Sequence, residues 1–133
     1  MDKRDNFLKE FRGATIGSIS SQSSTEEMFQ NEVLRPILKL QNDLFVASFK
    51  NYSAKYKSDF YSQTTEKKLS TIENAVQKDI KYRNALKGMV IGLFTAEEYV
   101  FYINNSSNLN KRMMNMLIER LKSQVQLFEV ETL

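Results

Sequence analysis

The chain has 133 residues and contains neither cysteine nor histidine. This composition excludes disulfides, thiolate nucleophiles, histidine general bases and the usual tetrahedral zinc sites. The 19 lysines and arginines and 16 acidic residues leave a net charge of +3, and this mild excess permits a polyanionic partner without requiring one.

Residues 1–24 are predicted to be a flexible N-terminal arm. Its second half, from Gly13 to Ser24, is rich in serine, threonine and glycine, which bury little surface. Its first half has Phe7, Leu8 and Phe11 on one side of a short amphipathic turn or two. These apolar side chains can anchor the arm to the core of the same molecule or to a partner, and the pattern does not decide between the two.

The start of the chain is charged and lacks the apolar centre of a secretory signal, and no stretch approaches the roughly 20 apolar residues of a membrane span. We therefore expect a cytoplasmic protein that does not contact a membrane.

Residues 25–133 are predicted to form a single helical domain. Ser24 and Glu27 have the spacing of a capping box, so a long helix should begin there. Its apolar positions recur with helical period and cover a broad arc, typical of a central helix. Pro36 should kink this helix near Arg35, because proline removes a backbone donor and clashes with the preceding turn. Gln41 and Ser48 lie within the apolar arc and need hydrogen-bond partners if buried.

Three further helices should follow the turn at residues 57–64. Thr64 or Thr65 caps a second helix that continues to about Val90. Thr95 and Glu98 have capping-box spacing, so that a short third helix should begin at Ala96. A last helix follows Asn108. The expected fold is therefore all-α, an irregular bundle of about four helices.

Asp79 and Arg83 are four residues apart on the predicted second helix. Opposite charges at this spacing can pair on a helix surface, and a partly buried pair can fix packing or belong to a ligand site.

Ala85, Gly88 and Gly92 form a strip without large side chains. A phosphate loop is excluded, because the sequence has no Gly-x-Gly and no Gly-Lys-Ser/Thr here, and the uncharged run is too short for a membrane motif. The strip indicates a close helix contact, either at the centre of the fold or with a second copy of the chain.

A patch of lysines and tyrosines surrounds the first helix–helix turn. Ammonium groups beside aromatic rings suit single-stranded nucleic acid. The alternative is structural, because lysines favour helix C-termini and tyrosines keep a polar tip at the core edge. The patch comprises Lys50, Tyr52, Lys55, Tyr56, Lys57, Tyr61, Lys67, Lys68, Lys78 and Lys81.

The segments VLRPILKLQNDLF (residues 33–45) and LNKRMMNMLIERL (residues 109–121) resemble a group of short, all-helical bacterial proteins of unassigned function. Some members of that group carry the name glyoxalase, which implies a metal-dependent lyase with βαβββ modules and His/Glu ligands. No such ligand pattern exists in this chain, which has no histidine, so we carry over neither the activity nor a metal.

The sequence therefore predicts a non-catalytic helical domain that binds another protein or itself, with no catalytic residues, cofactor or metal. The alternative is an RNA- or ribosome-associated factor that uses the lysine and tyrosine patch.

Overall fold

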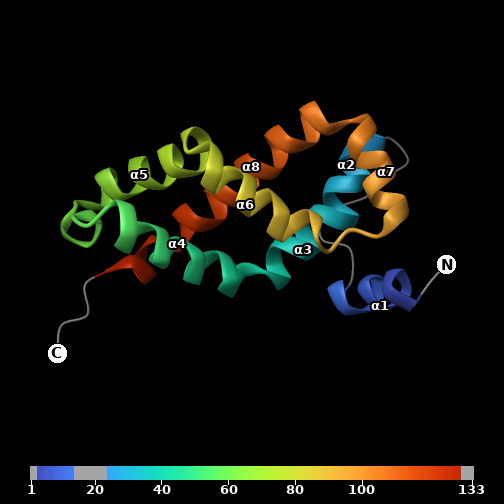
Figure 1. Ribbon diagram of the computed structural model, residues 1–133, viewed down its shortest axis with the longest axis horizontal. Coiled ribbons are helices and arrows are strands. Elements are labelled where there is room, and N and C mark those ends of the chain that lie inside the picture. The colour runs from blue at the N-terminus through green and yellow to red at the C-terminus, as the bar shows by residue number, and fades with distance from the viewer. Residues whose placement is uncertain (1–2, 14–23, 130–133) are drawn as a thin grey trace.

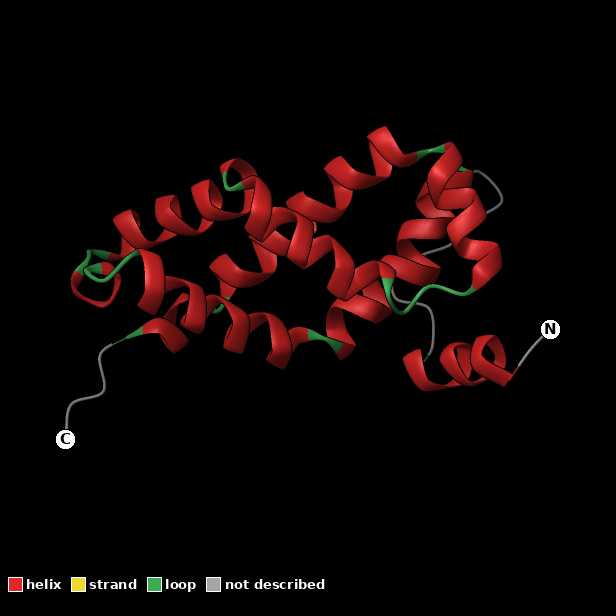
Figure 2. Ribbon diagram, in the orientation of Figure 1, coloured by secondary structure: helices red, strands yellow, loops and turns green. Residues whose placement is uncertain are grey.

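A computed structural model describes residues 3–13 and 24–129, and these residues contain helices and no strands (Figure 2). The all-α prediction is confirmed, but the helices are shorter and more numerous than the four expected. In chain order they are α1 (Lys3–Arg12), α2 (Thr25–Phe29), the π-helical turn η1 (Gln30–Leu34), α3 (Arg35–Leu40), α4 (Asn42–Tyr56), the 3₁₀ turn η2 (Phe60–Ser62), α5 (Thr65–Lys78), α6 (Ile80–Ile91), α7 (Ala96–Asn104), α8 (Ser106–Ser123) and the 3₁₀ turn η3 (Val125–Phe128).

The helices form an elongated bundle (Figure 1). The C-terminal part of α4, the N-terminal part of α5 and η2 form one end, whereas α2 and α7 lie at the other. The last long helix, α8, packs against α5, α6 and α7. This helix, and not the first predicted one, connects the two ends of the molecule.

Two clusters of aromatic rings occupy the core. Phe49, Phe60 and Phe128 meet at ring-centroid distances of 5.1–6.0 Å and are fully buried. Near the other end, Phe29 packs against Phe94 at 5.5 Å and Phe101 at 5.0 Å. Each fully buried phenylalanine contributes about 1.5–3 kcal/mol to folding through removal of apolar surface from water.

The kink predicted near Arg35 is not found in that form. Instead η1 precedes the proline, and the Arg35 N–H bonds to the carbonyl of Gln30, five residues back. This wider turn makes room for the proline ring, which would clash in a regular α-helix. The interruption comes later, at Gln41, which separates α3 from α4 (Figure 2).

Gln41 and Ser48 have the hydrogen-bond partners that their positions require. Gln41 donates from Nε2 to the carbonyl of Met89 at 2.9 Å, and the hydroxyl of Ser48 lies 3.1 Å from that of Tyr82. Both bonds join the first helical segments to α6.

Three of the four predicted helix starts are confirmed, whereas the last helix, α8, begins at Ser106 and not after Asn108. The hydroxyls of Ser24, Thr64 and Thr95 each accept the N–H three residues on, at 3.0, 3.2 and 3.1 Å. The Glu98 carboxylate also accepts from the Thr95 N–H at 2.8 Å, which completes the capping box of α7.

Residues 3–12 are not a flexible arm, because they form α1, which is docked beside the corner between α6 and α7. Arg4 donates to the carbonyls of Gly92 and Phe94, both at 2.9 Å. The carboxylate of Asp5 accepts from the Ala96 N–H in the first turn of α7 at 3.3 Å. These contacts satisfy backbone groups that helix ends leave without partners. The rest of the predicted arm, residues 14–23, lies outside the described residues.

Arg12 anchors the other end of α1. Its guanidinium forms a two-pronged ion pair with Glu98, at 2.5 and 2.7 Å, and also donates to the Leu93 carbonyl at 3.0 Å. Phe7 and Phe11 do not anchor α1 to the core. They stack on each other at 5.3 Å and are largely exposed.

None of the helices in the described ranges combines the length and apolar character needed to cross a membrane.

Candidate functional site

Asp79 separates α5 from α6, so the predicted second helix is in fact two helices. Its Oδ1 accepts the Tyr82 N–H at 3.2 Å and caps α6, and its Oδ2 accepts the Tyr52 hydroxyl at 2.8 Å. The hydrogen bond from the Tyr82 N–H lowers the pKa of Asp79 most, and the one from the Tyr52 hydroxyl lowers it further, so that it lies below its usual value.

The predicted Asp79–Arg83 pair is wrong. Arg83 donates to the carbonyl of Gln77 at 3.4 Å. Arg83 and Asp79 both lie in the described part of the chain, and no ion pair joins them. An N-cap contributes about 1 kcal/mol, whereas an exposed pair four residues apart contributes about 0.2–0.5 kcal/mol. The cap therefore determines the local structure.

Three tyrosine rings lie side by side beside this cap, and two of them are stacked. Tyr52 lies on Tyr82 with centroids 4.3 Å apart and planes at 21°, and Tyr56 follows at 5.2 Å from Tyr52. Burial, together with the hydrogen bond to Asp79, raises the pKa of Tyr52 to about 12, and burial raises that of Tyr82 to about 12. Both therefore stay neutral at ordinary pH. Tyr56, in contrast, is tilted by 49° from Tyr52 and has 62% of its surface exposed.

Two hollows flank the Tyr52–Asp79 hydrogen bond, which forms part of the wall of each. We call them the lysine grooves. The first, of about 600 Å³, is lined by Lys57, Lys67 and Lys78. The second, of about 440 Å³, is lined by Lys55 and Lys81, with Tyr56. The structure thus brings five lysines of the predicted patch to adjoining grooves, although they come from α4, α5, α6 and the turn after α4.

Four predicted patch residues have other surroundings or roles. Tyr52 is part of the wall between the grooves. Lys50 is exposed on α4 but lines neither groove. Lys68 is buried, with its ammonium group 5.9 Å from the centre of the Phe60 ring. Tyr61 packs edge-on against the same ring at 5.5 Å. Lys68 and Tyr61 therefore belong to the packing around Phe60, although Lys68 lies near the N-terminus of α5 and not at the helix C-terminus that the structural alternative assumed.

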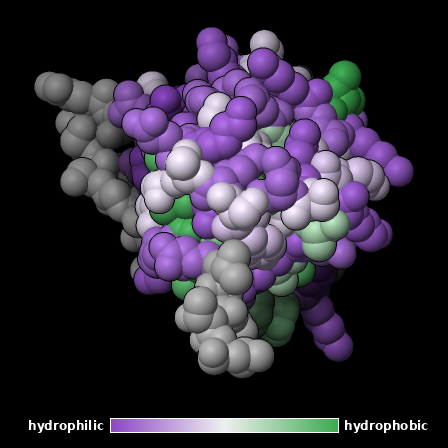
Figure 3. Space-filling model, turned by 90° about the vertical axis from the view of Figure 1, so that its left-hand side faces the viewer, coloured by the Kyte–Doolittle hydropathy of each residue, from purple (hydrophilic) through white to green (hydrophobic). Residues whose placement is uncertain are grey.

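The lysine grooves concentrate the positive charge of the protein. Five lysines against Asp59 and Asp79 leave 5 − 2 = +3, which equals the net charge of the whole 133-residue chain. The remaining residues therefore sum to zero. Figure 3, which views the end formed by α4, η2 and α5, shows hydrophilic side chains over most of that end.

Neutral polar side chains that no sequence pattern had indicated also line these grooves. Asn51 lines the second groove, whereas Gln63 and Ser70 line the first. Gln63 also accepts a hydrogen bond from the Thr71 hydroxyl at 3.0 Å. Isolated polar residues at a turn and on helix surfaces carry no pattern that would have singled them out.

The strip of Ala85, Gly88 and Gly92 is not at the centre of the fold. All three residues are exposed, and a Cβ added at Gly88 would have no neighbour within 4 Å. The predicted close contact with another helix of the same chain is therefore wrong. Val90 and Leu86 on the opposite side of α6 are fully buried and hold that helix in the core.

Among the residues that the structure describes, no three acidic side chains cluster as a metal site would require. Comparisons with protein-family models, with curated proteins and with solved structures find no match, so the proposals below rest on the geometry of this chain.

Proposed function

We propose that this protein is a non-catalytic binding module that takes single-stranded nucleic acid in the lysine grooves. The observation that carries the proposal is the exposed ring of Tyr56. It adjoins the stacked pair of Tyr52 and Tyr82, with its plane tilted by 49° from that of Tyr52, and it lines the same groove as Lys55 and Lys81.

The two halves of a nucleotide match the two kinds of side chain here. Phosphates pair with lysines and release bound counterions, and a base can stack on the exposed ring of Tyr56, a contact worth about 1–3 kcal/mol. Duplex DNA keeps its bases stacked on one another and offers no free face to Tyr56. The geometry therefore favours single strands over duplexes.

The lysine grooves also favour weak sequence discrimination. No arginine lines them, and lysine binds phosphate as a point charge without the planar fork that reads guanine edges. We expect similar affinity for single-stranded RNA and DNA of mixed sequence.

Replacement of Lys55, Lys57 and Lys67 by glutamine should weaken binding of a labelled single-stranded oligonucleotide and flatten its salt dependence. Each lost phosphate contact lowers the slope of log K against log salt by about 0.7 for a single strand. The slope should therefore fall by about 2 if all three lysines contact phosphates. Fluorescence anisotropy over a range of salt concentrations measures both quantities.

The matched control replaces Lys3, Lys39 and Lys111, which are exposed and lie outside the grooves. It changes the net charge equally and should retain most of the binding. Equal losses in the two triple variants, or no loss in the groove variant, would refute the proposal.

Tyr56→Ala should weaken binding while leaving the salt slope unchanged, because stacking releases no counterions.

A second candidate function, binding of a protein partner or a second copy of the chain, is favoured by the exposed face of α7. Tyr99, Val100 and Ile103 share this face, and each has about half of its surface exposed (46%, 56% and 50%). Adjacent exposed apolar side chains of this size are typical of interaction surfaces.

If α7 joins two copies, sedimentation velocity should show a dimer that the double variant Val100→Lys/Ile103→Lys converts to monomer. Leu44→Lys/Leu127→Lys removes two other exposed leucines and should leave the dimer intact. A wild-type monomer at all accessible concentrations would exclude self-association through this face.

A further inference from the structure

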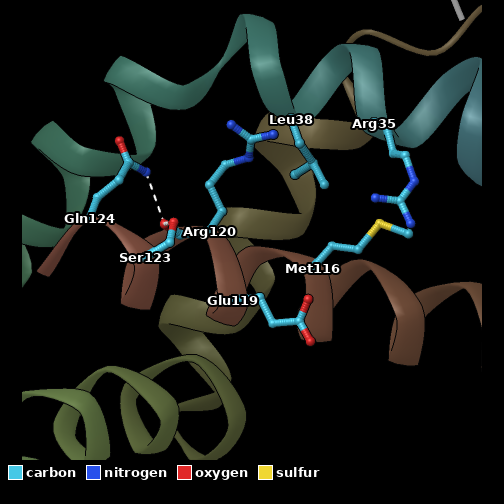
Figure 4. A pocket seen from close by; sticks show the side chains of 7 residues that line it. All are labelled: Arg35, Leu38, Met116, Glu119, Arg120, Ser123 and Gln124. Atoms are coloured by element: carbon cyan, nitrogen blue, oxygen red, sulfur yellow. Dashed lines mark hydrogen bonds between the residues drawn. The ribbon is translucent and has the colours of Figure 1, made fainter. Parts of the chain in front are cut away.

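Outside the lysine grooves, a hollow of about 490 Å³ lies between α3 and α8 (Figure 4). Arg35 of α3 and Arg120 of α8 both line it, with Leu38 and Met116 between them. It shares no lining residue with the lysine grooves.

Arg35 is oriented by its own helix. Its Nε donates to the Oδ1 of Asn31 at 3.0 Å, one turn earlier. This bond occupies one of the five donors of the guanidinium and leaves the two terminal nitrogens free to meet another acceptor.

Arg120 is partly buried, and its side chain makes no hydrogen bond or ion pair with any residue in the described ranges. Burial lowers the pKa of Arg120, and the nearby positive charge of Arg35 lowers it further. A partly desolvated cation that faces a second cation is unfavourable in the free protein. A bound anion would relieve both effects.

The acidic residue of this hollow does not neutralise the arginines. Glu119 lines it, but its carboxylate points away from both guanidinium groups in Figure 4. The amide side chain of Gln124 is occupied as well, because it pairs with that of Asn42 through two hydrogen bonds of 2.7 and 2.8 Å and donates to the Arg120 carbonyl at 2.9 Å. These bonds tie the end of α8 to α4 and fix the backbone that carries Arg120.

We infer that this hollow is a binding site for the oxyanion group, phosphate or carboxylate, of a small molecule. Arg35 and Arg120 would bind its oxygens through charge-assisted hydrogen bonds from two different helices. Leu38 and Met116 would contact an apolar part of the ligand. The arginine forks suit either anion, so the two sources are distinguished by experiment.

The test is thermal unfolding of the full chain in increasing inorganic phosphate or succinate, with ionic strength held constant by sodium chloride. Wild-type protein should show a saturable rise in melting temperature with at least one of the two anions, since a ligand that binds only the folded state stabilises it. The anion with the lower half-saturating concentration identifies the preferred group. Arg35→Gln and Arg120→Met should each raise that concentration by about tenfold or more.

Two controls separate this site from other effects. Arg83→Gln removes an arginine outside the hollow, and Lys57→Gln/Lys67→Gln/Lys78→Gln removes the charge of the first lysine groove. Both should keep the wild-type response. This separates the site from the proposed function, because loss of nucleic-acid binding and loss of the small-anion response then occur in different variants.

In chloride alone, Arg120→Met should melt at or above the temperature of the wild type, because it removes a partly buried charge that Arg35 repels and keeps most of the apolar stem. If Arg120→Met melts at a lower temperature than wild type, Arg120 has a structural role. The response of Arg35→Gln to phosphate and succinate then tests the anion site. A phosphate and succinate response that is absent in wild type, or that survives in Arg35→Gln, overturns the inference.

Discussion

At the scale of single residues, the protein handles two partly or fully buried arginines in different ways. Arg12 pairs with Glu98, and its guanidinium also donates to the carbonyl of Leu93. Arg120 has no such acceptor among the described residues and faces Arg35 instead. The first arrangement satisfies its charge within the fold, whereas the second leaves charge available to a ligand.

Glu98 should make the protein sensitive to acid. Burial alone would raise the pKa of Glu98, but hydrogen bonds from Arg12 and Thr95 outweigh it, so that the pKa lies below its usual value. A carboxylate with a lowered folded-state pKa stabilises the protein above its unfolded-state pKa of about 4.3, and this contribution is lost as pH falls through the folded-state value.

We therefore expect Glu98→Gln to lower the free energy of unfolding by about 1–3 kcal/mol at pH 7 and to differ less from wild type as the pH falls below about 4. Urea denaturation at several pH values measures this. Glu10→Gln, at an exposed position on α1, is the control and should differ little from wild type throughout. A difference between Glu98→Gln and wild type that stays constant with pH would contradict the role assigned to the Arg12–Glu98 pair.

At the scale of elements, features that depend on residues close together in the sequence could be predicted. The caps at Ser24, Thr64 and Thr95 follow from hydroxyl spacing, and α7 begins at Ala96 as expected. The break at Asp79 was missed because the same aspartate fits both a helix pair and an N-cap. Its contact with Tyr52, 27 residues earlier, is not visible in the local pattern.

The candidate sites were likewise predictable only where the sequence pattern is local. Alternation of lysine and tyrosine along the chain indicated the region of the grooves, but not that Lys68 would turn inward over Phe60. The hollow of Arg35 and Arg120 could not be predicted, because the two arginines are 85 positions apart in sequence (120 − 35 = 85) and only tertiary packing brings them together. The docking of α1 was hidden for the same reason.

The exposed glycine strip on α6 leads to a prediction for that helix. Gly88→Ala should raise the free energy of unfolding by about 0.4–1 kcal/mol, because alanine restricts the unfolded chain and the added methyl group meets no neighbour. Thermal or urea denaturation measures the change.

Gly92→Ala is the matched comparison. There a Cβ would lie 3.0 Å from the carbonyl oxygen of Gly88, so the substitution should bring no gain or should destabilise. A loss of stability in Gly88→Ala, together with a change of oligomeric state, would show that the strip is covered by another molecule in solution.

At the scale of the whole molecule, the lysine grooves and the exposed apolar face of α7 lie apart. The lysine grooves carry an excess of +3 beside α4, α5 and α6, whereas the exposed apolar side chains of α7 lie at the other end of the bundle (Figure 1). Helix α8 connects these ends and contributes Arg120 to the hollow beside α3. The proposed nucleic-acid and protein surfaces are thus far enough apart to be tested by independent variants.

The docking of α1 also has a consequence for biosynthesis. Its anchor Arg12 precedes its partner Glu98 by 86 positions. At a translation rate of roughly 5–20 residues per second, roughly 4–17 s pass between the synthesis of one residue and that of the other. During this interval Leu8, which is buried in the folded protein, and the charge of Arg12 have no native surface to join. The native docking of α1 therefore waits until α7 has been synthesised.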